Sequence, residues 1–96
     1  MISIFKSHPK PRYIYAIVKG KYLGEFFVHI EQKKDTHCFL SLPDLIIREV
    51  TDDKFKYGLD KNIIEKLSRL PNDVFEVCKQ QYFKNKQAAL NTNTTK

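Results

Sequence analysis

Several residue types are scarce in this chain, and each scarcity excludes a class of protein or of binding site. Of 96 residues, two are cysteine, three are glycine and none is tryptophan. Two cysteines cannot form the dense disulfide framework of a small secreted domain. The glycines at positions 20, 24 and 58 match neither a P-loop nor a dinucleotide-binding fingerprint. The sequence therefore predicts reduced thiols and no glycine-rich phosphate loop.

Long apolar runs are also missing. No segment approaches the ~20 consecutive apolar residues that a membrane-spanning helix requires. The first residues, Met1 to Lys6, have neither the apolar core nor the small-residue cleavage site of a secretory signal. We therefore expect a soluble, cytoplasmic protein without membrane contact.

Arginine is rare compared with lysine. Only three of the seventeen basic residues are arginine, whereas proteins that read base sequence favour the bidentate guanidinium. The net charge of +6 is uneven: residues 1–40 carry seven bases and three acids, residues 41–78 six and eight, and residues 79–96 four and none. Such a field attracts anionic partners without specifying a base sequence.

The composition is that of an ordinary globular domain. Hydrophobic residues make up 42% of the chain and charged residues 29%, and the length suits one modest core. We expect a single domain over residues 1–90 and a disordered polar tail over residues 91–96.

The first half of the chain has the pattern of strands. Residues 13–18, 22–31 and 37–42 are rich in β-branched and aromatic residues, and the polar segments between them favour short turns. Residues 45–50 are compatible with a strand or a short helix, and we favour the strand.

The second half has a helical pattern. Apolar residues at 63, 64, 67 and 70 predict a helix over residues 60–70 that begins at Asp60. Asp73 and Glu76 form a capping box, which predicts a second helix from there to about Ala88. Gly58 is interpreted as a turn residue before the first helix. The predicted fold is α+β: an antiparallel meander of three to four strands followed by two C-terminal helices packed on one face.

Candidate catalytic groups are few. His29, His37 and Cys38 are expected on neighbouring strands, but they lack the close ligand spacing of a zinc site. The two histidines are interpreted as isolated surface or rim residues, and Cys38 as a reduced, buried thiol. Cys78 falls on an apolar helical stripe, where cysteine packs as a small hydrophobe. Asp52 and its neighbour Asp53 are interpreted as solvated loop charges. We therefore expect a protein that is not an enzyme and that has no catalytic residue, metal, cofactor or small-molecule substrate.

The leading hypothesis is a small regulatory protein, accessory or inhibitor-like, that acts by protein–protein contact or as a homodimer. The last helix has an apolar arc wider than one sheet contact needs, although the helix expected over residues 60–70 is an alternative cover for that flank. Large aromatic side chains carry most interface energy, so the expected anchors are Phe27, Tyr82 and Phe83.

The alternative hypothesis is nucleic-acid binding by a basic-aromatic sheet face. Aromatic rings can stack bases while cations hold phosphates. The opposite interpretation, with the tyrosines in the core and the lysines merely solvated, remains open. The candidate residues are Lys10, Arg12, Tyr13, Tyr15, Lys19, Lys21, Lys33 and Lys34.

Overall fold

The described part of the chain forms one antiparallel sheet and two helices. The computed structural model describes residues 12–94, and the side chains of residues 12–89. In chain order the elements are β1 (Tyr13–Ile17), β2 (Phe26–Lys33), β3 (Thr36–Leu42), β4 (Ile46–Thr51), α1 (Asp52–Asp60), β5 (Ile64–Arg69) and α2 (Asn72–Thr94). The five strands are ordered β4-β3-β2-β1-β5, and every neighbouring pair is antiparallel. The predicted α+β class is therefore confirmed, but the described residues form five strands instead of three to four, and only α2 is C-terminal because α1 lies between β4 and β5.

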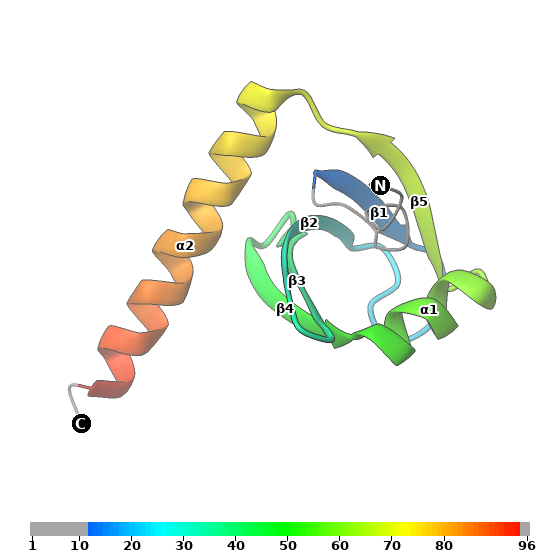
Figure 1. Ribbon diagram of the computed structural model, residues 1–96, viewed down its shortest axis with the longest axis horizontal. Helices are drawn as coiled ribbons and strands as arrows, with labels where there is room; N and C mark the ends of the chain where they lie inside the picture. Colours follow the sequence, from blue (N-terminus) through cyan, green and yellow to red (C-terminus); the bar gives the residue numbers. More distant parts are fainter. Residues whose placement is uncertain (1–11, 95–96) are drawn as a thin grey trace, which may run out of the picture.

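The sheet curves so strongly that its two edges face each other. Figure 1 shows β4 leading directly into α1, which crosses the open side of the curve and connects to β5. Helix α1 contacts β3, β4 and β5. The sheet therefore has a concave face closed by α1 and a convex face on its outside.

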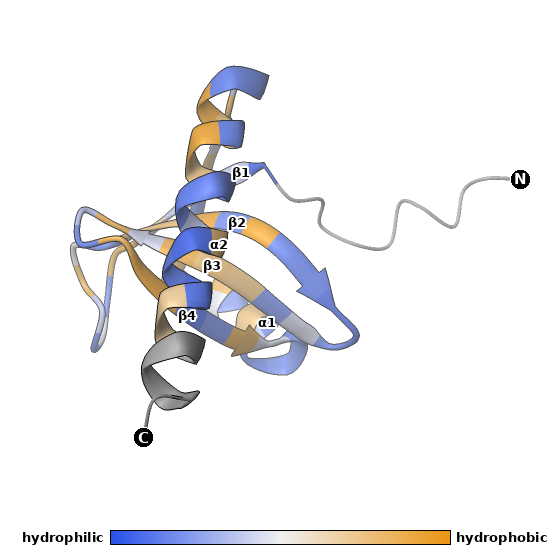
Figure 2. Ribbon diagram, turned by 90° about the vertical axis from the view of Figure 1, so that its left-hand side faces the viewer, coloured by the Kyte–Doolittle hydropathy of each residue, from blue (hydrophilic) through white to orange (hydrophobic). Residues whose placement is uncertain are grey.

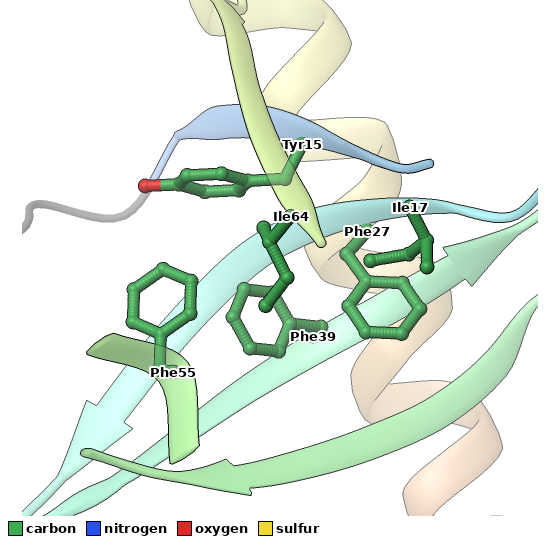
Figure 3. Close-up of a cluster of buried hydrophobic side chains, with 6 residues drawn as sticks. All are labelled: Tyr15, Ile17, Phe27, Phe39, Phe55 and Ile64. Atoms are coloured by element: carbon green, nitrogen blue, oxygen red, sulfur yellow. The ribbon is translucent and has the colours of Figure 1, made fainter. Parts of the chain in front are cut away.

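Side chains on the concave face form the first hydrophobic cluster. Because neighbouring residues of a strand point to opposite faces, alternate positions of β1, β2 and β3 reach this side. Phe55 of α1 and Ile64 of β5 complete the cluster, and Figure 3 shows them converging with the strand residues. The members are Tyr15, Ile17, Phe27, Phe39, Phe55 and Ile64, all nearly inaccessible to solvent.

The convex face packs against α2, so the two helices lie on opposite faces of the sheet and the predicted packing of both on one face is wrong. Figure 2 shows α2 running across β2, β3 and β4, and it contacts these three strands. Phe75 and Tyr82, separated by two helical turns, point from α2 into this second cluster, and Cys78 packs between them at its border. The buried members are Val28, Ile30, Cys38, Leu40, Phe75 and Tyr82. Neither α1 nor α2 combines the length and apolar content of a membrane span.

The helix predicted over residues 60–70 is wrong. Asp60 ends α1, and Ile64–Arg69 form β5, which pairs with β1 at the far edge of the sheet from β4. Only Ile64 is buried among the six residues of β5. The spacing of four apolar residues resembled a helix, but hydrogen bonding to the exposed edge of β1 fixes the strand instead, because tertiary context overrides weak local propensity.

The segment interpreted as a charged loop is helix α1. Asp52 and Asp53 occupy its first turn, where the positive end of the helix dipole favours acids. Gly58 is buried inside this helix and not in a turn before it. A Cβ atom at Gly58 would lie 2.5 Å from Cδ1 of Ile64. The glycine therefore allows α1 to approach β5 closely.

Strand β4 and the start of α2 lie close to where the sequence predicts them. The strand favoured for residues 45–50 is confirmed as β4. Helix α2 begins at Asn72, near the predicted start, and the carboxylate of Asp73 accepts a hydrogen bond from the backbone N–H of Val74 at 2.9 Å. The helix continues to Thr94, past the expected end at Ala88, so it includes residues 91–94 of the expected tail. Residues 95 and 96 lie outside the described range.

Candidate functional site

A cleft opens beside the concave cluster, between the β1–β2 turn, β4 and α1. Its volume is about 650 Å³, and apolar side chains that include Ile17, Phe27 and Ile64 form part of its lining. Volumes of roughly 300–1,000 Å³ are typical of sites that bind one small ligand. Residues of the concave core therefore also line this cleft.

Basic and aromatic side chains surround this apolar lining. The β1–β2 turn contributes Lys19, Lys21 and Tyr22, whereas α1 contributes Lys54 and Tyr57. Gly20 and Gly24, with φ angles of 87° and 95°, give this turn a backbone geometry that residues with side chains rarely adopt. Arg48 of β4 completes the charged lining. The next residue, Glu49, pairs with Cys38 and points its side chain to the convex face. Four cationic side chains therefore line the cleft, which favours an anionic ligand.

Arg48 is held by a cluster of polar and aromatic groups next to the cleft. Its Nε donates to Oε1 of Glu25 at 3.3 Å and its Nη2 donates to Oε2 at 3.0 Å. The hydroxyl of Ser41, only 1% exposed, donates to the same Oε1 at 2.6 Å. The guanidinium carbon lies 4.2 Å from the ring centroid of Tyr22, which is a cation–π distance. We call Glu25, Ser41, Arg48 and Tyr22 the arginine cluster.

The arginine cluster also lowers the pKa of Glu25. Partial burial acts to raise the pKa of Glu25, but hydrogen bonds from Ser41 and Arg48, together with the Arg48 charge, outweigh it. The pKa of Glu25 is therefore lower than usual, and the carboxylate stays ionised at neutral pH.

A second polar group is buried in the concave core. His29 and His37 are both fully buried, and Nδ1 of His37 lies 3.2 Å from Nε2 of His29. Nε2 of His37 lies 2.8 Å from Oδ1 of Asp52 in the first turn of α1. A neutral His37 that donates from Nε2 to this carboxylate must accept at Nδ1, so Nε2–H of His29 donates to it. The expectation of surface or rim histidines is therefore wrong.

Asp52 responds to these contacts. The hydrogen bond from His37, and then the one from Lys56, lowers the pKa of Asp52 below its usual value. Neither histidine lines the cleft. We therefore interpret the His29–His37–Asp52 chain as a support that fixes α1 against the sheet.

The sheet separates the thiols from the histidines. Cys38 follows His37 directly, so its side chain points to the convex face and packs under α2. Burial raises the pKa of Cys78, which disfavours a reactive thiolate. Both cysteines are free. Within the described residues, no group of three His, Cys, Asp or Glu side chains could hold a metal ion.

The eight residues expected to bind nucleic acid do not converge. Lys19 and Lys21 line the cleft. Lys33 and Lys34 lie at the other end of the eight-residue β2, about 25 Å away along the strand, and Lys33 is 3.6 Å from Glu31. Tyr15 belongs to the buried core, which corrects its expected place on a binding surface.

The remaining residues of that set lie elsewhere. Tyr13 is half-buried on β1, with Nζ of Lys66 4.0 Å from its ring centroid. The guanidinium of Arg12 lies over the ring of Phe75, near the start of α2. Lys10 lies outside the described residues.

The three aromatic residues expected to anchor a protein partner also separate. Phe27 and Tyr82 are buried, in the concave and the convex cluster respectively, so neither presents an exposed ring to a protein partner. This corrects their expected role. Phe83 is 40% exposed on α2, with its ring edge-on to Tyr82.

Sequence reasoning missed most of the cleft. Arg48, Glu25 and Ser41 come from three separate segments, and only the pairing of β2 with β3 and of β3 with β4 brings them together. The period of two predicts which face each side chain takes, but the register of neighbouring strands is not visible in one sequence. Lys54 and Tyr57 were missed because helix α1 was interpreted as a loop.

Comparison of the chain with models of protein families, with curated proteins and with solved structures found no match.

Proposed function

We propose that this protein is a non-catalytic binding protein that takes up nucleic acid at the cleft. One observation carries the proposal: four cationic side chains and two tyrosines, from three separate segments, surround one apolar hollow of about 650 Å³. Bases are apolar and aromatic on their faces, whereas the backbone that joins them is anionic. A cytoplasmic location, expected from the sequence, is compatible with this role.

The low arginine content agrees with binding that does not read base sequence. Three of the four cations of the cleft are lysines, which act as point charges towards phosphate. Arg48 is the exception, and its guanidinium is already engaged by Glu25. We therefore expect backbone attraction and stacking to dominate.

The test is salt-dependent binding of a fluorescently labelled oligonucleotide, followed by anisotropy. We expect binding at about 50 mM salt that weakens steeply by about 200 mM, because cations that neutralise phosphates release counterions. Changing Lys19 and Lys21 together to Glu should abolish it. The matched control changes Lys33 and Lys34 to Glu: it alters the net charge equally, at the other end of β2. Absence of binding at low salt, or equal losses in both double variants, would contradict the proposal.

A protein partner on α2 is a second candidate function. Val74 and Val77 are 42% and 68% exposed on one flank of the helix, and Phe83 is exposed on another. The helix expected over residues 60–70 was the alternative cover for a flank of α2. Residues 64–69 form β5 instead, at the edge of the sheet beside β1. This regulatory or inhibitor-like role predicts a complex that survives nuclease treatment and is weakened by Phe83→Ala. Recovery of the uncomplexed protein alone from its native host would contradict it.

A further inference from the structure

The guanidinium of Arg48 has an unused pair of donors. Arginine carries five N–H donors, and the hydrogen bonds to Glu25 use one on Nε and one on Nη2. The other three N–H groups have no acceptor among the described residues. Two of these three, one on each Nη atom, form the end of the guanidinium fork away from Glu25. Such a fork matches two oxygens of one phosphate group.

The neighbouring side chains suit the rest of a nucleotide. One face of the Tyr22 ring is covered by the guanidinium of Arg48. Tyr57, on the α1 side of the cleft, is 59% exposed and offers a ring for stacking. Between them lies the apolar lining formed by Ile17, Phe27 and Ile64.

We propose that the cleft takes one unstacked nucleotide of a single strand, with a phosphate on the open fork of Arg48 and the base against Tyr57. A base that is paired and stacked in a duplex cannot enter such a hollow without being flipped out. This inference rests on the proposed function and names its ligand and its contacts. Lys19, Lys21 and Lys54 attract the flanking phosphates.

Glu25 and Ser41 are then positioning residues for Arg48. Their effect runs against simple electrostatics, because Glu25 places a negative charge beside a cleft for anions. If only net charge mattered, neutralising Glu25 would strengthen binding. If its carboxylate holds the fork in place, neutralising it weakens binding, because the arginine side chain becomes free to rotate.

The decisive experiment compares two acid-to-amide variants. Glu25→Gln and Glu49→Gln make the same change in net charge, but the side chain of Glu49 points to the convex face of the sheet and is not bonded to Arg48. The probe is a labelled single-stranded oligonucleotide of about ten nucleotides, within the usual site size of single-strand binding folds. We expect Glu25→Gln to weaken binding about tenfold, as loss of one charge-assisted contact does. Glu49→Gln should leave binding unchanged or strengthen it. Equal or tighter binding by Glu25→Gln would overturn the positioning role.

Variants of Arg48 separate its charge from its shape. Arg48→Lys keeps the charge and loses the fork, so the salt dependence should stay while affinity falls. Arg48→Gln should also reduce the slope of log K against log salt by about 0.7, the value for one phosphate contact on a single strand. Thermal unfolding of each variant, followed by circular dichroism, shows that the fold is kept. Unchanged affinity in Arg48→Lys would overturn the phosphate contact.

The stacking contact is tested at an exposed residue, where loss of folding is not expected. Tyr57→Ala should weaken binding about tenfold or more, and Tyr57→Phe should retain it, because either aromatic ring stacks a base. Equal binding by Tyr57→Ala and the parent would overturn the contact.

Competition identifies the form of the nucleotide. A duplex of the same sequence should compete poorly, and so should a nucleoside monophosphate. If the duplex or the nucleoside monophosphate competed as well as the unlabelled single strand at the same concentration, the proposal of a single-stranded ligand would be wrong. Failure of every oligonucleotide to bind would also end the proposed function. Salt-dependent binding that Glu25→Gln, Arg48→Lys and Tyr57→Ala all leave unchanged would remove only this inference.

Discussion

The Nε2 atom of His37 lies 2.8 Å from Oδ1 of Asp52, and this bond connects the start of β3 to the first turn of α1. The His37 side chain is fully buried, whereas that of Asp52 is partly exposed. The ring of Phe55, one turn along the helix, lies 4.6 Å from the His37 ring. Helix α1 places Lys54 and Tyr57 in the lining of the cleft. The position of these two residues therefore depends on the contact of α1 with the buried His37 side chain.

Replacing this imidazole should destabilise the fold. We expect His37→Ala to lower the free energy of unfolding by about 2–4 kcal/mol, because it removes a buried ring and leaves a cavity. Asp52→Asn should cost much less, because the amide oxygen can still accept from Nε2–H. Urea unfolding measures both. A smaller loss in His37→Ala than in Asp52→Asn would contradict the role of His37 in supporting α1.

Acid should weaken the fold through two carboxylates. The pKa of Asp52 is lowered by its hydrogen bonds to His37 and Lys56, and that of Glu25 by Ser41 and Arg48 against partial burial. A group whose folded pKa lies below its unfolded pKa of about 4 stabilises the protein above that pH. The contribution is lost as the pH falls towards the lowered folded pKa.

The variant with both Asp52→Asn and Glu25→Gln should therefore lose less stability than the parent between about pH 5 and the acid limit. Urea unfolding at a series of pH values measures the two curves. Parallel curves for parent and variant would show that these two acids do not carry the pH dependence.

Gly58 should tolerate no side chain. Gly58→Ala gains up to about 1 kcal/mol of helix propensity, but its Cβ would meet Cδ1 of Ile64 at 2.5 Å. Overpacking of this kind costs about 1–3 kcal/mol, so we expect a net loss of stability. Ile64→Val removes the nearest atom and should partly rescue Gly58→Ala in a double-mutant cycle of thermal unfolding. Strictly additive effects would contradict the contact.

Tyr82 should account for much of the attachment of α2. It is fully buried against the convex face, so Tyr82→Ala should lower the free energy of unfolding by about 3–5 kcal/mol. Val77→Ala, at a 68% exposed position of the same helix, is the matched control and should change it by less than about 0.5 kcal/mol. Chemical denaturation measures both, and similar losses in the two variants would argue against the packing of α2 described above.

The strands were the most predictable part of the fold. Alternation of apolar residues and a high content of β-branched and aromatic residues identified β1 and β3 closely, and β4 by preference over a helix. The capping pattern around Asp73 identified the start of α2. These are local signals, since each depends on residues that are neighbours in the chain.

The errors occurred where a local signal was weak and a distant partner decided the outcome. Residues 64–69 have an apolar spacing that suits a helix, but the free edge of β1 makes them a strand. Residues 52–60 are rich in charge and resemble a loop, but Phe55 and the bond from Asp52 to His37 fix them as a helix on the core. Neither partner is near in the sequence.

Composition and periodicity were enough to establish the α+β class, the antiparallel pairing and the excess of positive charge. The curvature of the sheet, the buried histidines and the arginine cluster depend instead on strand register and on α1 closing the concave face. Glu25, Ser41 and Arg48 are separated along the chain, and hydrogen bonding between strands brings them within contact distance. A sequence pattern reports which face a side chain takes, whereas the energy of packing distant segments decides which side chains meet.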